Sequence, residues 1–123
     1  MISIQEIDDE TAARAIREGG IPETLRNPGG LAAVILTQSW CGQWTAMRRY
    51  LDEMTREEGA GEEDLQVWFI EYDRKSYFQP FMEFKEASLG NDLVPYIRYY
   101  RKGELTGESN YVSRYSFLEN LRS

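Results

Sequence analysis

The fold is indicated most clearly by one segment of the sequence, Leu31-Ala32-Ala33-Val34-Ile35-Leu36-Thr37-Gln38-Ser39-Trp40-Cys41-Gly42-Gln43-Trp44. Its first six residues are continuously apolar, and a run of this length between loops is typical of a strand buried on both faces of a sheet. Residues 37–42 form a turn, and a helix is predicted over residues 43–58. The apolar stripe of this helix has spacings of three and four and comprises Trp44, Met47, Leu51 and Met54. The chain therefore passes from a central strand into an amphipathic helix, with Cys41 at the junction.

Similar patterns predict the other elements. Strands are expected over residues 2–7, 65–72, 94–100 and 104–112. Helices are expected over residues 10–18, 80–88 and from Ser113 onward, and their candidate caps or first residues are Asp8, Asp9, Ser76 and Pro80. The resulting order β-α-β-α-β-α-β-β-α predicts an α/β fold. It has a mixed central sheet of about five strands, flanked on both faces by about four helices, in a single domain over residues 1–123.

Composition limits the functions open to the chain. It has 123 residues, a formal net charge of −7 and a sequence pI of about 4.7. This acidic balance argues against binding to nucleic-acid phosphates or to an anionic membrane surface. There is no His and only one Cys, which excludes an intramolecular disulfide, histidine-dependent catalysis and a thiolate–imidazole zinc site. We therefore expect a soluble protein with no metal and no cofactor.

The start of the chain gives an expectation about location. Residues 1–6 lack the basic and apolar regions of a signal peptide. The longest apolar run, Leu31 to Leu36, is too short to span a bilayer. A cytoplasmic location is therefore expected.

Cys41 is the residue on which any nucleophilic or redox chemistry is expected to depend. It follows a buried strand and precedes a helix, so the free N–H groups and positive dipole end of that helix favour a thiolate. Gly42 permits close approach of the backbone. Two interpretations stay open: an exposed, redox-competent thiol, which the position favours, and an inert core cysteine, which is the usual state of a free Cys.

Two motifs carry a resemblance to a known family. Trp40-Cys41-Gly42-Gln43-Trp44, after an apolar strand, resembles the W-C-G-x-C active-site motif of thioredoxins. Val94-Pro95 before an aromatic-rich strand, followed by Lys102-Gly103-Glu104, resembles the cis-proline segment of that family and the turn after it. The order of strands and helices matches as well. The resemblance implies a thioredoxin-like fold over nearly the whole chain, from about Ile2 to Leu121.

The resemblance also implies roles for individual residues. Cys41 matches the nucleophilic cysteine of the family. Pro95 matches the proline whose cis bond brings the preceding residue, here Val94, to the active site, where its backbone pairs with a bound peptide. The remaining residues of the predicted partner-binding site flank the cysteine, namely Trp40, Gly42, Gln43 and Trp44, and Trp44 is expected to be half exposed there.

The sequence departs from the thioredoxin pattern at positions that matter for activity. Trp44 stands where the second, resolving cysteine should be, and Gln43 replaces the usual proline. The buried acid of the family falls on Ile35, and the lysine that faces it falls on Phe69. Tyr111 falls where the family often has a glycine beside the peptide groove. Ordinary dithiol–disulfide reductase activity is therefore not expected.

Two functions follow from this combination. The first is monothiol exchange in thiol redox homeostasis: Cys41 forms a mixed disulfide with a protein or a low-molecular-weight thiol, and a second external thiol completes the cycle. The second is a non-catalytic adaptor module, in which the groove beside Trp40, Trp44 and Pro95 binds a peptide without sulfur chemistry. Either function is compatible with a monomer or with a dimer linked through Cys41.

Overall fold

A mixed β-sheet runs through the middle of the protein. The computed structural model describes residues 2–57 and 64–122, and in these the sheet has five strands in the order β1-β3-β2-β4-β5. The strands are β1 (Ile2–Glu6), β2 (Leu31–Thr37), β3 (Leu65–Glu71), β4 (Tyr96–Arg101) and β5 (Glu104–Ser109). Strands β1, β3 and β2 are parallel, whereas β4 and β5 run antiparallel to their neighbours. The expected mixed sheet is thus confirmed.

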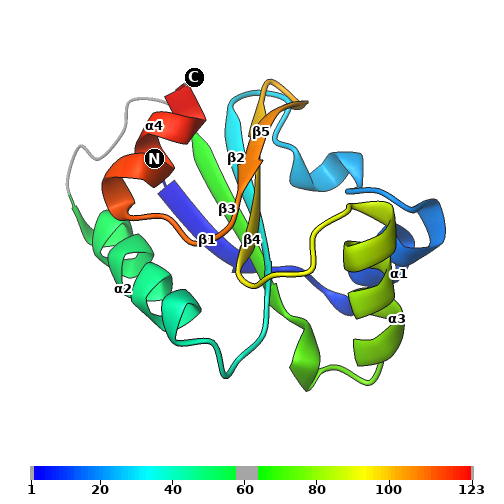
Figure 1. Ribbon diagram of the computed structural model, residues 1–123. Helices are drawn as coiled ribbons and strands as arrows, with labels where there is room; N and C mark the ends of the chain where they lie inside the picture. The colour runs from blue at the N-terminus through cyan, green and yellow to red at the C-terminus, as the bar shows by residue number, and fades with distance from the viewer. Residues whose placement is uncertain (1, 58–63, 123) are drawn as a thin grey trace.

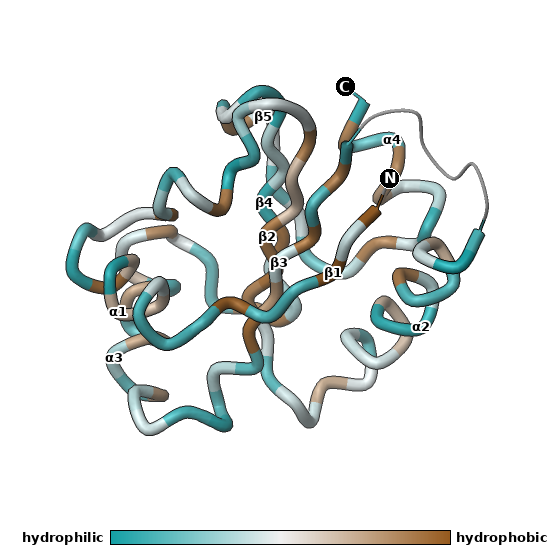
Figure 2. The backbone as a smooth tube through the Cα atoms, turned by 180° about the vertical axis from the view of Figure 1, so that it is seen from behind, coloured by the Kyte–Doolittle hydropathy of each residue, from teal (hydrophilic) through white to brown (hydrophobic). Residues whose placement is uncertain are grey.

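Helices cover both faces of this sheet. The α-helices of the described residues are α1 (Asp9–Glu18), α2 (Gly42–Arg56), α3 (Phe78–Glu83) and α4 (Arg114–Arg122). Helices α2 and α4 lie on one face, and α1 and α3 lie on the other (Figure 1). Hydropathy follows this layering: hydrophobic positions gather along the central strands, whereas the helices alternate between hydrophilic and hydrophobic positions (Figure 2). Among the described residues, no helix has the length and apolar character needed to cross a bilayer.

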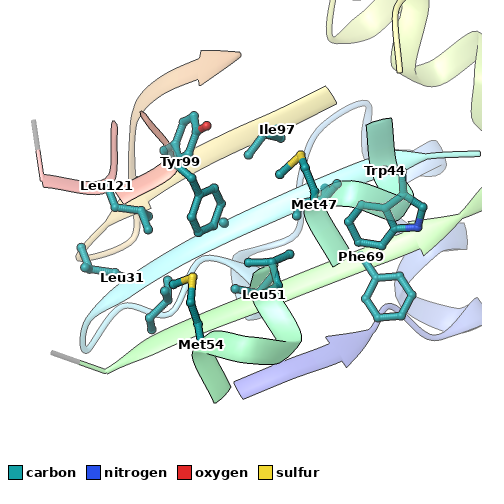
Figure 3. Packing of buried hydrophobic residues seen from close by; sticks show 14 of the residues in the cluster. Leu31, Trp44, Met47, Leu51, Met54, Phe69, Ile97, Tyr99 and Leu121 are labelled. Atoms are coloured by element: carbon teal, nitrogen blue, oxygen red, sulfur yellow. The ribbon is translucent and has the colours of Figure 1, made fainter. Parts of the chain in front are cut away.

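The strand and helix on either side of Cys41 have the burial that their sequence predicts. All seven residues of β2 are buried, because β2 lies between β3 and β4 and is covered on both faces. The stripe of α2 packs on the sheet, and all four of its members are buried (Figure 3). Burying each such side chain contributes roughly 1.5–3 kcal/mol. This packing holds the start of α2 against the end of β2.

The start of α1 agrees with the sequence-based prediction, whereas the start of α3 does not. Asp8 caps α1, since its Oδ1 accepts a hydrogen bond from Thr11 N at 2.7 Å. At α3 the predicted start is wrong: the helix begins at Phe78, and its N-cap residue, Tyr77, makes no side-chain capping bond. A π-helical turn, Phe84–Ser88, continues α3. Residue 58, the predicted end of the second helix, lies outside the described residues.

Candidate functional site

Cys41 lies at the junction of β2 and α2, as the sequence predicts. It is the N-cap residue of α2, and its carbonyl oxygen accepts a hydrogen bond from Thr45 N at 3.1 Å. Its own N–H donates to Gln38 O at 3.2 Å, which closes the turn after β2. The residue therefore occupies the positive end of the α2 dipole, although its side chain makes no capping hydrogen bond.

The expectation of an exposed thiol is wrong, because only 5% of Cys41 is exposed. The side chain belongs to the apolar cluster that contains Ile35, Trp44 and Phe69. Its Sγ also lies 3.7 Å from Val94 O, which accepts a weak hydrogen bond from the thiol. The resemblance placed Val94 at the active site but gave no sign that its carbonyl, 53 residues further along the chain, lies on the sulfur and helps to cover it.

The segment before β4 reaches the sulfur through strand pairing. Strands β2 and β4 are antiparallel, with Leu36 opposite Tyr96, so the end of β2 lies beside the start of β4. The peptide bond between Val94 and Pro95 is cis. Val94 is half-buried and Pro95 is buried. The fold thus brings together the two sequence motifs on which the resemblance depends.

Trp44 is buried, so the expectation of a half-exposed indole is also wrong. Only 2% of the residue is exposed, and its ring packs at a tilt on Phe69 with 5.4 Å between centroids (Figure 3). Its Nε1 donates to Glu71 Oε2 at 2.8 Å, which satisfies the one polar atom of the indole. Residue 44 therefore belongs to the core beneath the site rather than to the surface that a partner would contact.

An apolar layer lies where the resemblance places an acid and a lysine. Ile35 and Phe69 are register partners on the neighbouring strands β2 and β3, and both are buried. The guanidinium of Arg48 stacks over the outer side of Phe69, 4.6 Å from the ring centroid. Of the residues that the structure describes, Lys85 is the only charged one that is buried, and it lies against Tyr96 of the other apolar cluster.

We use the name exposed rim for five exposed residues that are close in the chain to Cys41, Val94 or Asn110: Trp40, Gly42, Gln43, Leu93 and Tyr111. Trp40 is the most exposed of its large hydrophobic members, at 69%. Leu93 precedes Val94 in the chain, and Tyr111 follows Asn110, whose amide donates to Leu93 O and Pro95 O. The exposed rim thus combines large hydrophobic side chains with the polar side chain of Gln43.

Asp73 fixes the loop that carries Trp40, and sequence reasoning missed it. Its carboxylate accepts from Ser39 N at 2.7 Å and from Ser39 Oγ at 2.5 Å. Beside it, Gln38 Nε2 donates to Tyr72 OH, and Trp40 Nε1 donates to Gln38 Oε1. Burial raises the pKa of Tyr72, which keeps its phenol protonated, while the bond from Gln38 opposes this shift. No local signal marks Asp73, because its partners lie 34 residues earlier.

A second set of polar contacts fixes the segment before β4. Asn91 and Asn110 bond to one another through both side-chain amides, at 3.0 and 3.2 Å. The ammonium of Lys85, in the π-helical turn, donates to Asn91 O at 2.7 Å. The sequence gives no sign of this set either, since its members come from three separate segments. Among the described residues, no group of three or more His, Cys, Asp or Glu side chains is placed to hold a metal ion.

Comparison with solved structures identifies the fold. Thioredoxin O2 from Arabidopsis thaliana, in its oxidized state, matches with a TM-score of 0.64 and 12% identity, over 98% of this chain and 92% of that one. Thioredoxin f from spinach chloroplast, short form, matches with a TM-score of 0.63 and 15% identity, over 97% and 90%. A buckwheat glutaredoxin–glutathione complex matches with a TM-score of 0.53 and 17% identity, over 94% and 91%.

Sequence comparison adds no closer assignment. No protein-family model matches the chain. No curated protein matches it either. At the identities found among solved structures, the likeness establishes the fold: the chain has the thioredoxin fold, as the sequence motifs predicted.

Proposed function

We propose that this protein performs monothiol exchange at Cys41, as part of thiol redox homeostasis. One observation carries the proposal: Cys41 Sγ, at the positive end of α2, lies 3.7 Å from the backbone carbonyl of Val94, next to the cis bond to Pro95. The only thiol of the chain is thus adjacent to a backbone segment that can pair with an extended peptide. The thioredoxin fold supports a thiol-redox function of this general kind.

The proposed reaction balances with an external disulfide and an external thiol. The Cys41 thiolate attacks one sulfur of a disulfide R–S–S–R′, forms a new bond to R–S and releases R′–S⁻. An external thiolate then attacks the R–S sulfur of this mixed disulfide. The products are a new external disulfide and the Cys41 thiolate, so the protein undergoes no net oxidation.

The external thiol is needed because the chain has no second cysteine. Residue 44 is a buried Trp whose indole is fixed between Phe69 and Glu71. A low-molecular-weight thiol suits the release step because it needs little space beside the sulfur. One of the solved structures with this fold is a glutaredoxin bound to glutathione, which is an example of such a thiol with a protein of this fold.

The exposed rim supports a protein partner for the first step. Trp40 and Leu93 are large apolar side chains that stand in solvent on segments adjoining Cys41 and Val94. Aromatic and aliphatic side chains in such positions are typical anchors at interfaces. Gly42 and Gln43 are exposed on the helix side and complete the proposed contact surface.

Exchange with glutathione disulfide, followed by intact mass measurement, tests the proposal. We expect the native protein to gain one glutathionyl group and to lose it when reduced glutathione is added, whereas Cys41→Ser gains none. The proposal fails if native Cys41 stays unmodified under conditions in which the urea-unfolded chain is modified.

A second function is favoured by a specific observation, the 5% exposure of Cys41 beneath an exposed rim. In this alternative the protein is an adaptor that binds a peptide through the rim and uses no sulfur chemistry. A pull-down without reductant separates the two functions. Partners that Cys41→Ser retains indicate docking, and partners that only the native protein holds and that reductant releases indicate exchange.

A further inference from the structure

We propose that Lys85 and Asn110 are positioning residues, which hold residues 91–95 so that the Val94 carbonyl lies on the Cys41 sulfur. The inference rests on the proposed function in taking Cys41 as the reactive group. It adds residues that lie in other parts of the fold and that none of the sequence motifs includes. The contacts that support it form a continuous path from the π-helical turn to the sulfur.

Lys85 is the first member of this path. It is fully buried, the only Asp, Glu, Lys or Arg of which this is true among the described residues. Its Nζ donates to Asn91 O at 2.7 Å, and its backbone carbonyl accepts from Asn91 N at 3.4 Å. Residue 85 therefore fixes residue 91 through both its side chain and its backbone.

The burial of this ammonium is costly, which makes a purely space-filling role a poor explanation. Lys85 lies 5.7 Å from the centroid of the Tyr96 ring, beside an apolar cluster in which a Met side chain would pack without losing hydration. Burial lowers the pKa of Lys85, while the nearby carboxylates of Glu86 and Asp92 oppose this shift. The ammonium donates a hydrogen bond to Asn91 O, so its directional effect acts on Asn91.

Asn91 in turn bonds to Asn110, which is the next residue of the path. The two side-chain amides bond reciprocally, at 3.2 and 3.0 Å. Asn91 Oδ1 also accepts from Leu93 N at 3.0 Å, which turns the backbone toward Val94. An amide pair of this kind fixes two segments relative to one another, because each side chain both donates and accepts.

Asn110 completes the path on either side of Val94. The two hydrogens of its Nδ2 donate to Asn91 Oδ1 and to Pro95 O, both at 3.0 Å, and Leu93 O, at 3.4 Å, shares one of them. Pro95 is therefore fixed by Asn110 and Leu93 mainly by Asn91, and the Val94 carbonyl between them accepts from Cys41 Sγ. Loss of either Lys85 or Asn110 would release the same segment.

Release of this segment has two effects on the sulfur, and both act in the same direction. It uncovers Sγ, and it removes the carbonyl that accepts the hydrogen bond of the thiol. A small reagent should then react faster. The rate with a peptide disulfide should rise less than the rate with the small reagent, because the Val94 backbone is no longer fixed to pair with the peptide.

Alkylation of Cys41 by iodoacetamide tests the proposal in the intact protein. We expect Lys85→Met and Asn110→Ala each to raise the rate about three- to tenfold, and to raise it more than the rate with a peptide disulfide. The double variant should react like the single ones, because both changes release one segment. Lys102→Met, at an exposed lysine in the β4–β5 turn, is the matched control and should stay within about twofold of the native rate.

A merely structural role gives a different result. It lowers the urea midpoint but leaves the ratio of the iodoacetamide rate to the peptide-disulfide rate unchanged in the folded protein, and that outcome overturns the proposal. Rate effects that multiply in the double variant also overturn it, since they indicate independent sites. Because Asn110 is only half-buried, Asn110→Ala keeps the test available if Lys85→Met does not fold.

Failure of the proposed function would be distinguishable from failure of this inference. If the native protein forms no mixed disulfide with glutathione, monothiol exchange fails, yet the iodoacetamide rates still decide whether Lys85 and Asn110 position Val94. If exchange is found and the rates do not change, only the positioning role fails.

Discussion

The two sides of Cys41 differ in how they are built. Toward α2 and β3 the sulfur meets an apolar layer, in which Ile35, Trp44 and Phe69 are buried together. Toward β4 it meets a backbone carbonyl, fixed by a polar path that starts at a buried lysine. In the described parts of the chain the only buried charge is that of Lys85, which bonds to Asn91 and not to the thiol. The two sides of the sulfur therefore differ in chemistry: one is apolar, and the other presents a backbone carbonyl.

The largest effect is expected when a charged side chain replaces an apolar one in the buried layer beside Cys41. We expect Ile35→Asp to lower the free energy of unfolding by about 5 kcal/mol at pH 8, because it removes a buried side chain and buries an unpaired carboxylate. Such burial raises the pKa of the carboxyl in the folded state above its unfolded value of about 3.9. The folded chain then binds more protons than the unfolded one, so stability falls as the pH rises through this window.

The matched control for this substitution is Ile35→Asn, which has the same shape and no charge. Urea unfolding at pH 8 and pH 4 should show the Asp variant less stable than the Asn variant at pH 8 and the two nearly equal at pH 4. A constant difference between them at both values of pH would mean that the apolar side tolerates a carboxylate.

The next largest effect is expected from the two tryptophans near Cys41 in the sequence, which differ in burial. We expect Trp44→Ala to cost about 4 kcal/mol of unfolding free energy, because it opens a cavity beside Phe69 and leaves Glu71 without the indole N–H. Trp40→Ala should cost less than about 0.5 kcal/mol, since its side chain is exposed. Urea unfolding of both variants measures this difference, and equal costs would contradict the assignment of residue 44 to the core.

The smallest effect concerns the polar side, where the native chain already carries a titrating group. Because the pKa of Lys85 is lowered in the fold, the folded protein binds fewer protons than the unfolded chain as the pH approaches 10.5. The native protein should therefore gain stability relative to Lys85→Met as the pH rises through this range. Using the variant as reference cancels the titration of the tyrosines.

Urea unfolding of both proteins between pH 7 and pH 10 measures this gain. The difference in unfolding free energy should grow in favour of the native protein toward high pH. A difference that stays flat would show that the Lys85 ammonium is as well solvated in the fold as in the unfolded chain.

Local patterns were sufficient to predict the framework of the site. The apolar run of β2 and the stripe of α2 are properties of short segments, so both the elements and the position of Cys41 between them follow from the sequence. Asp8 also acts as the cap that its residue type predicts. The cis bond before Pro95 came from resemblance rather than from local physics.

Burial at the site could not be predicted in the same way. Whether Cys41 is exposed depends on Val94, and whether residue 44 faces solvent depends on Phe69 and Glu71 in another strand. Lys85 lies in a helical stretch where a lysine is ordinarily expected to face solvent, yet it is buried and contacts Asn91 and the Tyr96 ring. These facts depend on which segments of the chain pack against one another, and residue type and spacing do not predict that.

The unequal placement of the three tryptophans gives the protein a built-in optical probe. Trp44 is buried and Trp68 is half-buried, whereas the indole of Trp40 is in solvent and is fixed to Gln38 beside the thiol. Red-edge fluorescence and its quenching by iodide should therefore report mainly on Trp40. Occupation of the neighbouring surface by any ligand would be visible as a blue shift, with no label attached to the one cysteine.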